Sequence, residues 1–284
     1  MKSLGNSILF IVLFLSHLVQ ASNTSSSFLS CLQFFLKGQP LQITPPFPKE
    51  KESLIEYIKK TASAPSLSGY VESAKVVFIG EHHPNESSRK YVISQLGDLK
   101  EKGFTVLALE MFNSKNQELL DRFSKNEASS KDLLMYLKAE WGWRPETYVA
   151  LLEEAKKLGM KLVAIDDRTG GDTPARDQNM AQVLAKLVVE QPETKIVVFS
   201  GGIHASLESR ERMHFLFKKK TGLPTFSIMI DWKNDFNRNV ADGFPNESVY
   251  ALVGDAFDSS GILTSTFVHF DRDRYFFDAY LFQP

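Results

Sequence analysis

The chain is poor in cysteine, with a single copy among its 284 residues. Within this chain, that count excludes a disulfide framework, a zinc site with several cysteine ligands and an iron–sulfur cluster held by cysteines. An excess of charge of one sign is missing too, because 33 Lys and Arg residues stand against 34 Asp and Glu residues. A protein that binds nucleic acid through a broad basic field is therefore not expected.

Two common hydrolase signatures are also missing. The sequence has no Gly-x-Ser-x-Gly motif and no His-Glu-x-x-His motif, so a serine hydrolase with a nucleophile elbow and an ordinary zincin are both disfavoured. Apolar residues make up 43% of the chain and charged residues 24%, and there are 22 phenylalanines. This composition is typical of a folded globular protein with a sizeable core.

The N-terminal segment has the features of a secretory signal peptide. Lys2 precedes an unbroken apolar run at residues 8–15, which is too short to span a bilayer as a mature helix. We expect cleavage after about Ala21, and hence an exported protein, periplasmic or secreted, without a stable transmembrane span. An uncleaved membrane anchor is the alternative. A lipoprotein anchored through Cys31 is disfavoured, because the polar stretch 22–27 separates this cysteine from the apolar run.

The rest of the chain is expected to form a lead-in and one domain. Residues 22–50 are rich in Ser and Pro and predict an extended lead-in. Over residues 51–284, which we expect to form a single domain, short apolar runs alternate with amphipathic stretches. Five of these runs predict strands that are buried on both faces: residues 75–80, 105–110, 161–166, 195–200 and 225–230.

The spacing of these runs predicts an α/β fold. Apolar residues recur at helical spacing between the runs, and where nothing is inserted the runs begin about 30 residues apart, the length of a βαβ unit. We therefore expect a mainly parallel central sheet with helices on both faces. Residues 113–145 predict a helical insertion after the second strand, and the aromatic, alternating stretch 249–282 predicts a C-terminal edge hairpin.

Acidic and histidine side chains follow the first four expected strands. The first strand ends in Glu81 and His83, and the others end in Glu110, Asp166 with Arg168, and His204. Because the carboxyl ends of parallel strands open onto one crevice, we expect these side chains to converge there. In an extended chain Glu81 and His83 point the same way and His82 the opposite way. His214 falls on a later helix and is expected at the surface.

Five short motifs, in this order, resemble those of a known family. They are Gly80-Glu81-His82-His83, Leu109-Glu110-Met111-Phe112, Trp143 and Tyr148 before Gly159, Arg176-Asp177-Gln178-Asn179-Met180-Ala181, and Gly201-Gly202-Ile203-His204-Ala205. The set is similar to the ChaN family of haem-binding, iron-regulated proteins. That family shares a superfamily with the Tiki metalloproteases, the TraB proteins and the erythromycin esterases. The resemblance covers roughly residues 70–232.

The resemblance implies that the shared site of the superfamily is formed by Glu81, His83, Glu110 and His204. The chain departs from the family pattern at Pro84, where the family often has an acidic residue followed by further histidines. It also departs at Asp166-Asp167, where the third strand of the family usually ends in an Asn.

Two function classes follow, and the first is ligand binding. The resemblance implies an exported ChaN-like protein that binds haem or a metal ion in the crevice, with iron uptake as its expected role. Trp141 and Trp143 could line an apolar slot for haem, and Arg168 or Arg176 could neutralise its propionates. The residues expected to contact the ligand are Glu81, His83, Glu110, Asp166, Arg168, Arg176, His204 and Trp143.

The second class is hydrolysis, with Glu81, His83, Glu110 and His204 as catalytic residues. A divalent metal would take three protein ligands, and His83, His204 and Glu81 could be those three, as in a Tiki-like peptidase. Alternatively, a Glu–His pair could polarise water without a metal, as the resemblance to the erythromycin esterases implies. Both classes predict a small-molecule or haem ligand, and both leave the oligomeric state open. Two buried carboxylates should raise the pKa of at least one of them, unless a protonated histidine, Arg168 or a metal offsets their repulsion, and Glu110→Gln is expected to leave the fold largely intact.

Overall fold

The fold is seen in a computed structural model of the whole chain, which describes residues 71–168, 173–206, 210–232, 250–253 and 279–283. The expected signal peptide (1–21), the lead-in (22–50) and Cys31 lie outside the described residues, as does most of the stretch expected to form the edge hairpin (249–282). Over the described ranges, no helix combines the length and the apolar character that a membrane span needs.

The described strands form one sheet of seven, in the order β3-β2-β4-β1-β5-β7-β6. All neighbouring strands are parallel except β6 and β7, which form an antiparallel pair at the edge. The strands are β1 (Val76–Glu81), β2 (Phe104–Asn113), β3 (Lys161–Asp166), β4 (Lys195–Gly201), β5 (Thr225–Trp232), β6 (Tyr250–Val253) and β7 (Ala279–Gln283). The α/β class and the parallel arrangement of the five expected strands are therefore confirmed.

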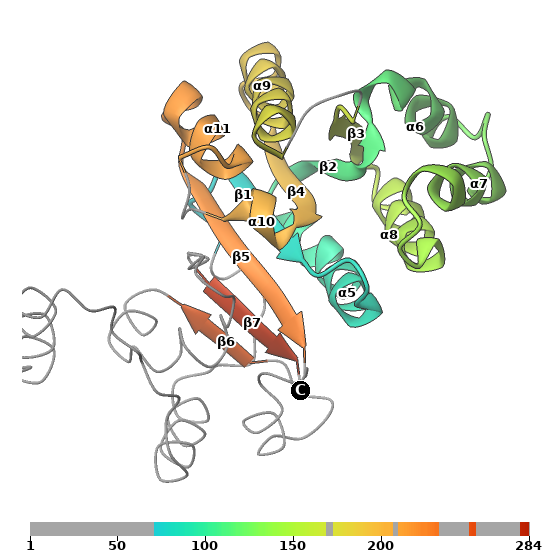
Figure 1. Cartoon of the computed structure of the whole chain (residues 1–284), viewed down its shortest axis with the longest axis horizontal. Coiled ribbons are helices and arrows are strands. Elements are labelled where there is room, and N and C mark those ends of the chain that lie inside the picture. The colour runs from blue at the N-terminus through green and yellow to red at the C-terminus, as the bar shows by residue number, and fades with distance from the viewer. Residues whose placement is uncertain (1–70, 169–172, 207–209, 233–249, 254–278, 284) are drawn as a thin grey trace, which may run out of the picture. The chain divides into compact units, whose positions relative to one another are not determined.

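Helices connect the strands, as the βαβ spacing predicted. They are α5 (Glu86–Glu101), α6 (Gln117–Ser124), α7 (Ser130–Glu140), α8 (Pro145–Lys157), α9 (Thr173–Glu190), α10 (Gly202–Ala205) and α11 (Met213–Thr221), with a short 3-10 helix η1 (Ser114–Asn116). Side-chain caps define where two of these helices begin: Asn85 caps α5, and Ser129 with Asp132 forms a capping box at α7. The expected insertion after β2 consists of η1, α6 and α7, and α8 follows it (Figure 1).

Both faces of the sheet are covered by helices. In β1, Val77 and Ile79 belong to one apolar cluster, whereas Val76 and Phe78 belong to another. Residues of α5, α6, α7 and α8 complete the first cluster, and residues of α9 and α11 complete the second. Since successive side chains of a strand point to opposite faces, a strand that is buried on both sides has no polar alternation.

Two glycines bring α10 down onto the sheet. A β carbon built on Gly80 would lie 2.8 Å from the α carbon of Gly202, and one built on Gly202 would lie 2.6 Å from Sδ of Met229. Side chains at these two positions would push α10 away from β1 and β5. Because α10 follows β4 directly, this close approach holds His204 at the carboxyl edge of the sheet.

His214 does not lie at the surface, and that prediction was wrong. Its side chain is fully buried and stacks on Phe78, with ring centroids 4.3 Å apart. Its Nδ1 lies 3.2 Å from the carbonyl oxygen of Ala205, and its Nε2 lies 2.7 Å from Oγ1 of Thr225. The apolar stripe of α11 is wide enough to take in this position, and the two hydrogen-bonding contacts make burial of the ring tolerable.

Candidate functional site

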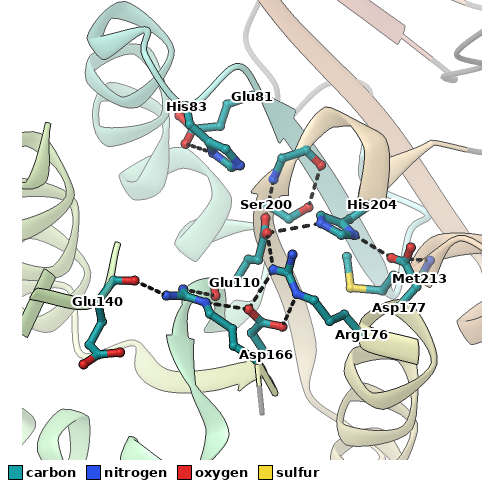
Figure 2. Close-up of polar contacts among 12 residues, drawn as sticks. Glu81, His83, Glu110, Glu140, Asp166, Arg176, Asp177, Ser200, His204 and Met213 are labelled. Carbon is teal, nitrogen blue, oxygen red and sulfur yellow. Dashed lines mark hydrogen bonds and ion pairs between the residues drawn. The ribbon is translucent and has the colours of Figure 1, made fainter. Parts of the chain in front are cut away.

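The four residues expected to share a site lie together at the carboxyl edge of the sheet (Figure 2). Nδ1 of His83 is 3.2 Å from Oε1 of Glu81, and Nε2 of His204 is 3.2 Å from Oε1 of Glu110. Gly201 lies beside both pairs, because a β carbon built on it would be 2.9 Å from Nε2 of His83 and 3.5 Å from Oε2 of Glu110. The structure thus brings the four side chains together, while their roles remain predictions.

Glu81 is buried at the end of β1, and both of its carboxylate oxygens have partners. Oε2 accepts a hydrogen bond from Nη1 of Arg89 at 2.9 Å, and Oε1 accepts one from the hydroxyl of Tyr148 and also faces His83. Burial raises the pKa of Glu81, although the contacts with His83 and Arg89 oppose this shift. The carboxyl group can therefore hold the ring of His83 with Nδ1 toward Glu81 and Nε2 on the other side.

Arg89 is a residue of this site that the strand ends did not reveal. Its side chain is fully buried in α5, Nη1 donates to the carbonyl oxygen of His83 at 3.0 Å, and Nε donates to Oγ1 of Thr147 at 2.5 Å. Its guanidinium carbon lies 4.1 Å from the ring centroid of Tyr148. Arg89 thus ties α5 and α8 to the backbone of His83. Its position on the apolar face of an expected helix is the feature of the sequence that could have identified Arg89 as a site residue.

Glu110, in β2, accepts hydrogen bonds on both carboxylate oxygens. Oε1 lies 2.9 Å from Nη2 of Arg176 and 3.2 Å from Nε2 of His204, and Oε2 accepts the backbone N–H of Gly201 at 2.6 Å. Burial on its own would raise the pKa of Glu110, but the charge and the hydrogen bond of His204 outweigh it and hold the pKa well below its ordinary value. Glu110 is therefore a paired carboxylate at neutral pH.

His204 is held between two carboxylates. Its Nε2 faces Glu110, and its Nδ1 lies 2.6 Å from Oδ1 of Asp177. Burial lowers the pKa of His204, but the two carboxylates outweigh burial and raise it to about 10. The ring is therefore an imidazolium near neutral pH and donates both N–H groups. Asp177 belongs to one of the family motifs but was not among the expected site residues.

The two arginines expected to neutralise a ligand hold protein groups. Nε and Nη2 of Arg176 lie 3.0 Å and 2.7 Å from the two carboxylate oxygens of Asp166. Nε of Arg168 lies 2.9 Å from the same carboxylate, and its other nitrogens donate to the carbonyl oxygens of Glu110 at 3.2 Å and Glu140 at 2.5 Å. Asp166 therefore anchors both arginines. Arg168 fastens the end of α7 to β2 and β3, and Arg176 fastens α9 to the same two strands.

An aromatic wall flanks His83. The ring centroid of Trp141 lies 4.7 Å from that of His83 in a T-shaped contact, and the centroid of Trp143 lies at 6.2 Å. The guanidinium carbon of Arg168 stands 4.5 Å from the Trp141 centroid. Trp143 is 46% exposed. Among the four expected site residues, the side chain of His83 is 24% exposed and those of Glu81, Glu110 and His204 are buried. His83 and Trp143 therefore form the accessible part of the site.

The expected metal triad of His83, His204 and Glu81 is not assembled as a metal site. Over the described residues, no group of three His, Cys, Asp or Glu side chains is arranged to hold a metal ion. The physical reason is that both ring nitrogens of His204 face carboxylates, while the carboxylate of Glu81 is engaged by Arg89 and Tyr148. A single haem ligand is a different case, because His83 keeps Nε2 on the side of its ring away from Glu81.

Residues 68–168 match a family model described as haem-binding uptake, Tiki superfamily, ChaN. A multifunctional-autoprocessing repeats-in-toxin protein of Vibrio vulnificus is 32% identical over 117 residues, which cover 39% of this chain and 2% of that protein. The chain thus spans a very small part of the length of this curated relative.

Two solved structures share the fold. The type III effector HopBA1 aligns with a TM-score of 0.51 at 14% identity, over 76% of this chain and 91% of the effector. A mutant of the erythromycin esterase EreC in its open conformation aligns with a TM-score of 0.52 at 12% identity, over 77% of this chain and 92% of the esterase. These two likenesses show the fold alone. The segment 68–168, which carries Glu81, His83 and Glu110, thus matches the model of the ChaN-type family of the Tiki superfamily, the family that the motifs predicted.

Proposed function

We propose that the protein is a hydrolase in which the Glu81–His83 pair activates a water molecule without a metal ion. The observation that carries this proposal is the orientation of His83, with Nδ1 3.2 Å from Oε1 of Glu81 and Nε2 beside Gly201. An accessible histidine that a carboxylate orients from behind can act as a general base. The exposure of His83 supports this role, because its side chain is 24% exposed while that of Glu81 is fully buried.

The proposed reaction is hydrolysis of an acyl bond, in an ester or an amide. With Nδ1–H donated to Glu81, the lone pair on Nε2 of His83 accepts a proton from water as the water oxygen attacks the acyl carbon. His83 then gives this proton to the leaving oxygen or nitrogen as its bond to the acyl carbon breaks. A carboxylic acid and an alcohol or amine are released, and His83 returns to its neutral form.

The second pair supplies fixed charge beside the base. Burial would raise the pKa of Glu110, but the charge of His204 keeps it low, so Glu110 remains anionic and can stabilise the imidazolium that forms on His83. The two carboxyl groups therefore differ, since the pKa of Glu81 is raised by burial and that of Glu110 is lowered by its partners. Such a split is typical of sites in which two acids have separate roles.

The test is a hydrolysis assay on the full chain, with p-nitrophenyl esters and p-nitroanilides as substrates, before and after thorough treatment with a chelator. We expect turnover to survive the chelator and to fall roughly 10²- to 10⁴-fold in His83→Ala, the usual range for loss of a general base. His82→Ala, at the neighbouring position, is the matched control and should retain turnover. Loss of turnover on chelation, or an equal loss in both variants, would contradict the proposal.

A second candidate function is haem binding, and the aromatic wall supports it together with the description of the family model. Nε2 of His83 would hold the haem iron, with Nδ1 hydrogen-bonded to Glu81. Export by way of residues 1–21 and a role in iron uptake belong to this candidate. Titration with haemin should then shift the Soret band for the wild-type chain and for His204→Ala, but not for His83→Ala. A haemin spectrum that the protein leaves unchanged would rule it out.

A further inference from the structure

Asp177 is a fully buried acid in α9, and its carboxylate has three partners. Oδ1 lies 2.6 Å from Nδ1 of His204 and accepts the backbone N–H of Met213 at 3.0 Å. Oδ2 lies 3.4 Å from Nη1 of Arg212. Because both oxygens of this buried carboxylate have partners, its position in the structure is well defined.

Asp177 and its neighbour Arg176 reach the two ends of the Glu110–His204 pair. Arg176 contacts Oε1 of Glu110 at 2.9 Å, and Asp177 contacts Nδ1 of His204 at 2.6 Å (Figure 2). Charges therefore alternate along a row from Arg176 through Glu110 and His204 to Asp177. Two consecutive residues of one helix hold both members of the pair in place.

From this geometry we propose that Asp177 is a positioning residue that fixes Glu110 beside His83 by acting through the ring of His204. Oε1 of Glu110 lies 3.2 Å from Nε2 of His204, so a ring that turns about its side-chain bonds would remove this contact and leave Oε1 with Arg176 alone. The proposal rests on the proposed hydrolase for the role of Glu110, while the contact itself can be tested without any substrate.

The backbone beside His204 is held independently of its side chain. The carbonyl oxygen of Ala205 lies 3.2 Å from Nδ1 of His214 and accepts a hydrogen bond from the hydroxyl of Ser227 at 2.5 Å. These contacts anchor α10 to α11 and to β5. Loss of the Asp177 carboxylate is therefore expected to free the ring of His204 and to leave its main chain in place.

Asp177 could instead have a purely structural role, and a test must distinguish that role from the positioning of His204. Met213 is the first residue of α11, and the N-cap residue Arg212 makes no side-chain cap. Asp177 supplies the missing cap from another helix by accepting the N–H of Met213 at 3.0 Å. Asp177→Asn keeps the cap and changes the hold on His204: the amide oxygen can still accept the N–H of Met213, whereas the negative charge that faces Nδ1 of His204 at the same oxygen is lost.

In the hydrolysis assay, Asp177→Asn should lower kcat roughly 10- to 100-fold, the range for a residue that orients a reacting group through another side chain. KM should change little, because Asp177 is buried away from the accessible part of the site. Phe217→Leu is the matched control. It replaces a buried residue of α11, the helix that Asp177 caps, so it weakens the packing of α11 and should retain kcat. Unchanged kcat in Asp177→Asn would overturn the positioning role.

Proton NMR on the full chain labelled with ¹⁵N-histidine tests the contact without a substrate. The Nδ1–H of His204, facing a buried carboxylate, should give a far-downfield resonance that is missing in His204→Gln. Asp177→Asn should lose this resonance or move it upfield, and Phe217→Leu should keep it. A resonance that Asp177→Asn leaves unmoved would overturn the proposal and leave Asp177 as a cap of α11. If the wild-type chain hydrolyses nothing, the hydrolase proposal fails, but a resonance lost in Asp177→Asn still supports the hold of Asp177 on His204.

Discussion

The ring of His83 lies directly against Gly201 at the end of β4. A β carbon built on Gly201 would be 2.9 Å from Nε2 and 3.0 Å from Cε1 of His83. The backbone of Gly201, with φ −59° and ψ 145°, is in a region that any residue adopts. Glycine is therefore needed at this position for space and not for its conformational freedom.

Gly201→Ala should displace the ring of His83 and lower turnover by about 10²-fold, the scale of a misplaced reacting group. Gly97→Ala, in α5, is the matched control, because nothing lies within 4 Å of a β carbon built there. The control should retain turnover and gain about 0.5–1 kcal/mol of stability. Full turnover in Gly201→Ala would show that the close approach of His83 to the glycine is not required.

Glu110→Gln should destabilise the fold by roughly 3–5 kcal/mol, because the buried imidazolium of His204 and the half-buried guanidinium of Arg176 each lose a charged partner. Urea unfolding measures this loss. Glu118→Gln, at an exposed position of α6, is the control and should change the free energy of unfolding by less than about 0.5 kcal/mol. An equally stable Glu110→Gln variant would mean that the alternating row of charges adds nothing to stability.

The sequence predicted the sheet and the meeting point of the four site residues, because strands that are buried on both faces leave uninterrupted apolar runs. It did not predict what each acid binds. Arg89, Tyr148 and Asp177 lie on helices, and tertiary packing decides which strand end each of them reaches. For this reason the sequence did not show which cations offset the charges of the two acids: Glu81 is paired with Arg89, and Glu110 with Arg176 and His204.

The loop that carries Trp143 has an unusual backbone. Gly142 has a φ of 81°, and Arg144, which is not a glycine, has a φ of 43°. A left-handed conformation at a residue with a β carbon costs on the order of 1 kcal/mol. Such a cost beside the accessible His83 indicates that the placement of Trp143 matters to the site.

Trp143→Ala should therefore raise KM for substrates with an apolar or aromatic acyl group and should change kcat less, because the side chain is 46% exposed and touches only the accessible edge of the site. Met135→Ala, at a 60% exposed apolar residue of α7, is the control for loss of exposed apolar surface. Steady-state kinetics on a series of acyl chain lengths measures both variants. The same rise in KM in the two variants would argue against a contact between Trp143 and the substrate.

His214 should make stability depend on pH on the acid side. Burial lowers its pKa from 6.5 to about 4 in the folded chain. A group with a lowered pKa of this kind adds stability above 6.5, and this stability is lost as the pH falls toward 4, because the unfolded chain takes up the proton first. His214→Asn, which cannot titrate in this range, should weaken the acid-side decrease in the free energy of unfolding. Urea unfolding at a series of pH values measures it, and an unchanged decrease would contradict a buried neutral ring.

His204 should make stability depend on pH on the alkaline side, where the free energy of unfolding should fall as the pH rises. Burial lowers its pKa, but the carboxylates of Glu110 and Asp177 outweigh burial and raise it from 6.5 to about 10. Stability from a raised pKa is fully present below 6.5 and is lost as the pH rises toward 10, because the unfolded chain gives up its proton first. His204→Gln should therefore be less stable than the wild type below 6.5, by a few kcal/mol in order of magnitude, and should show a weaker decrease toward high pH. His214→Asn serves as the control and should keep the full alkaline decrease. If the wild type and His204→Gln lose stability in parallel above pH 6.5, the ring of His204 is neutral in the folded chain. The row of alternating charges would then lack the positive charge between Glu110 and Asp177.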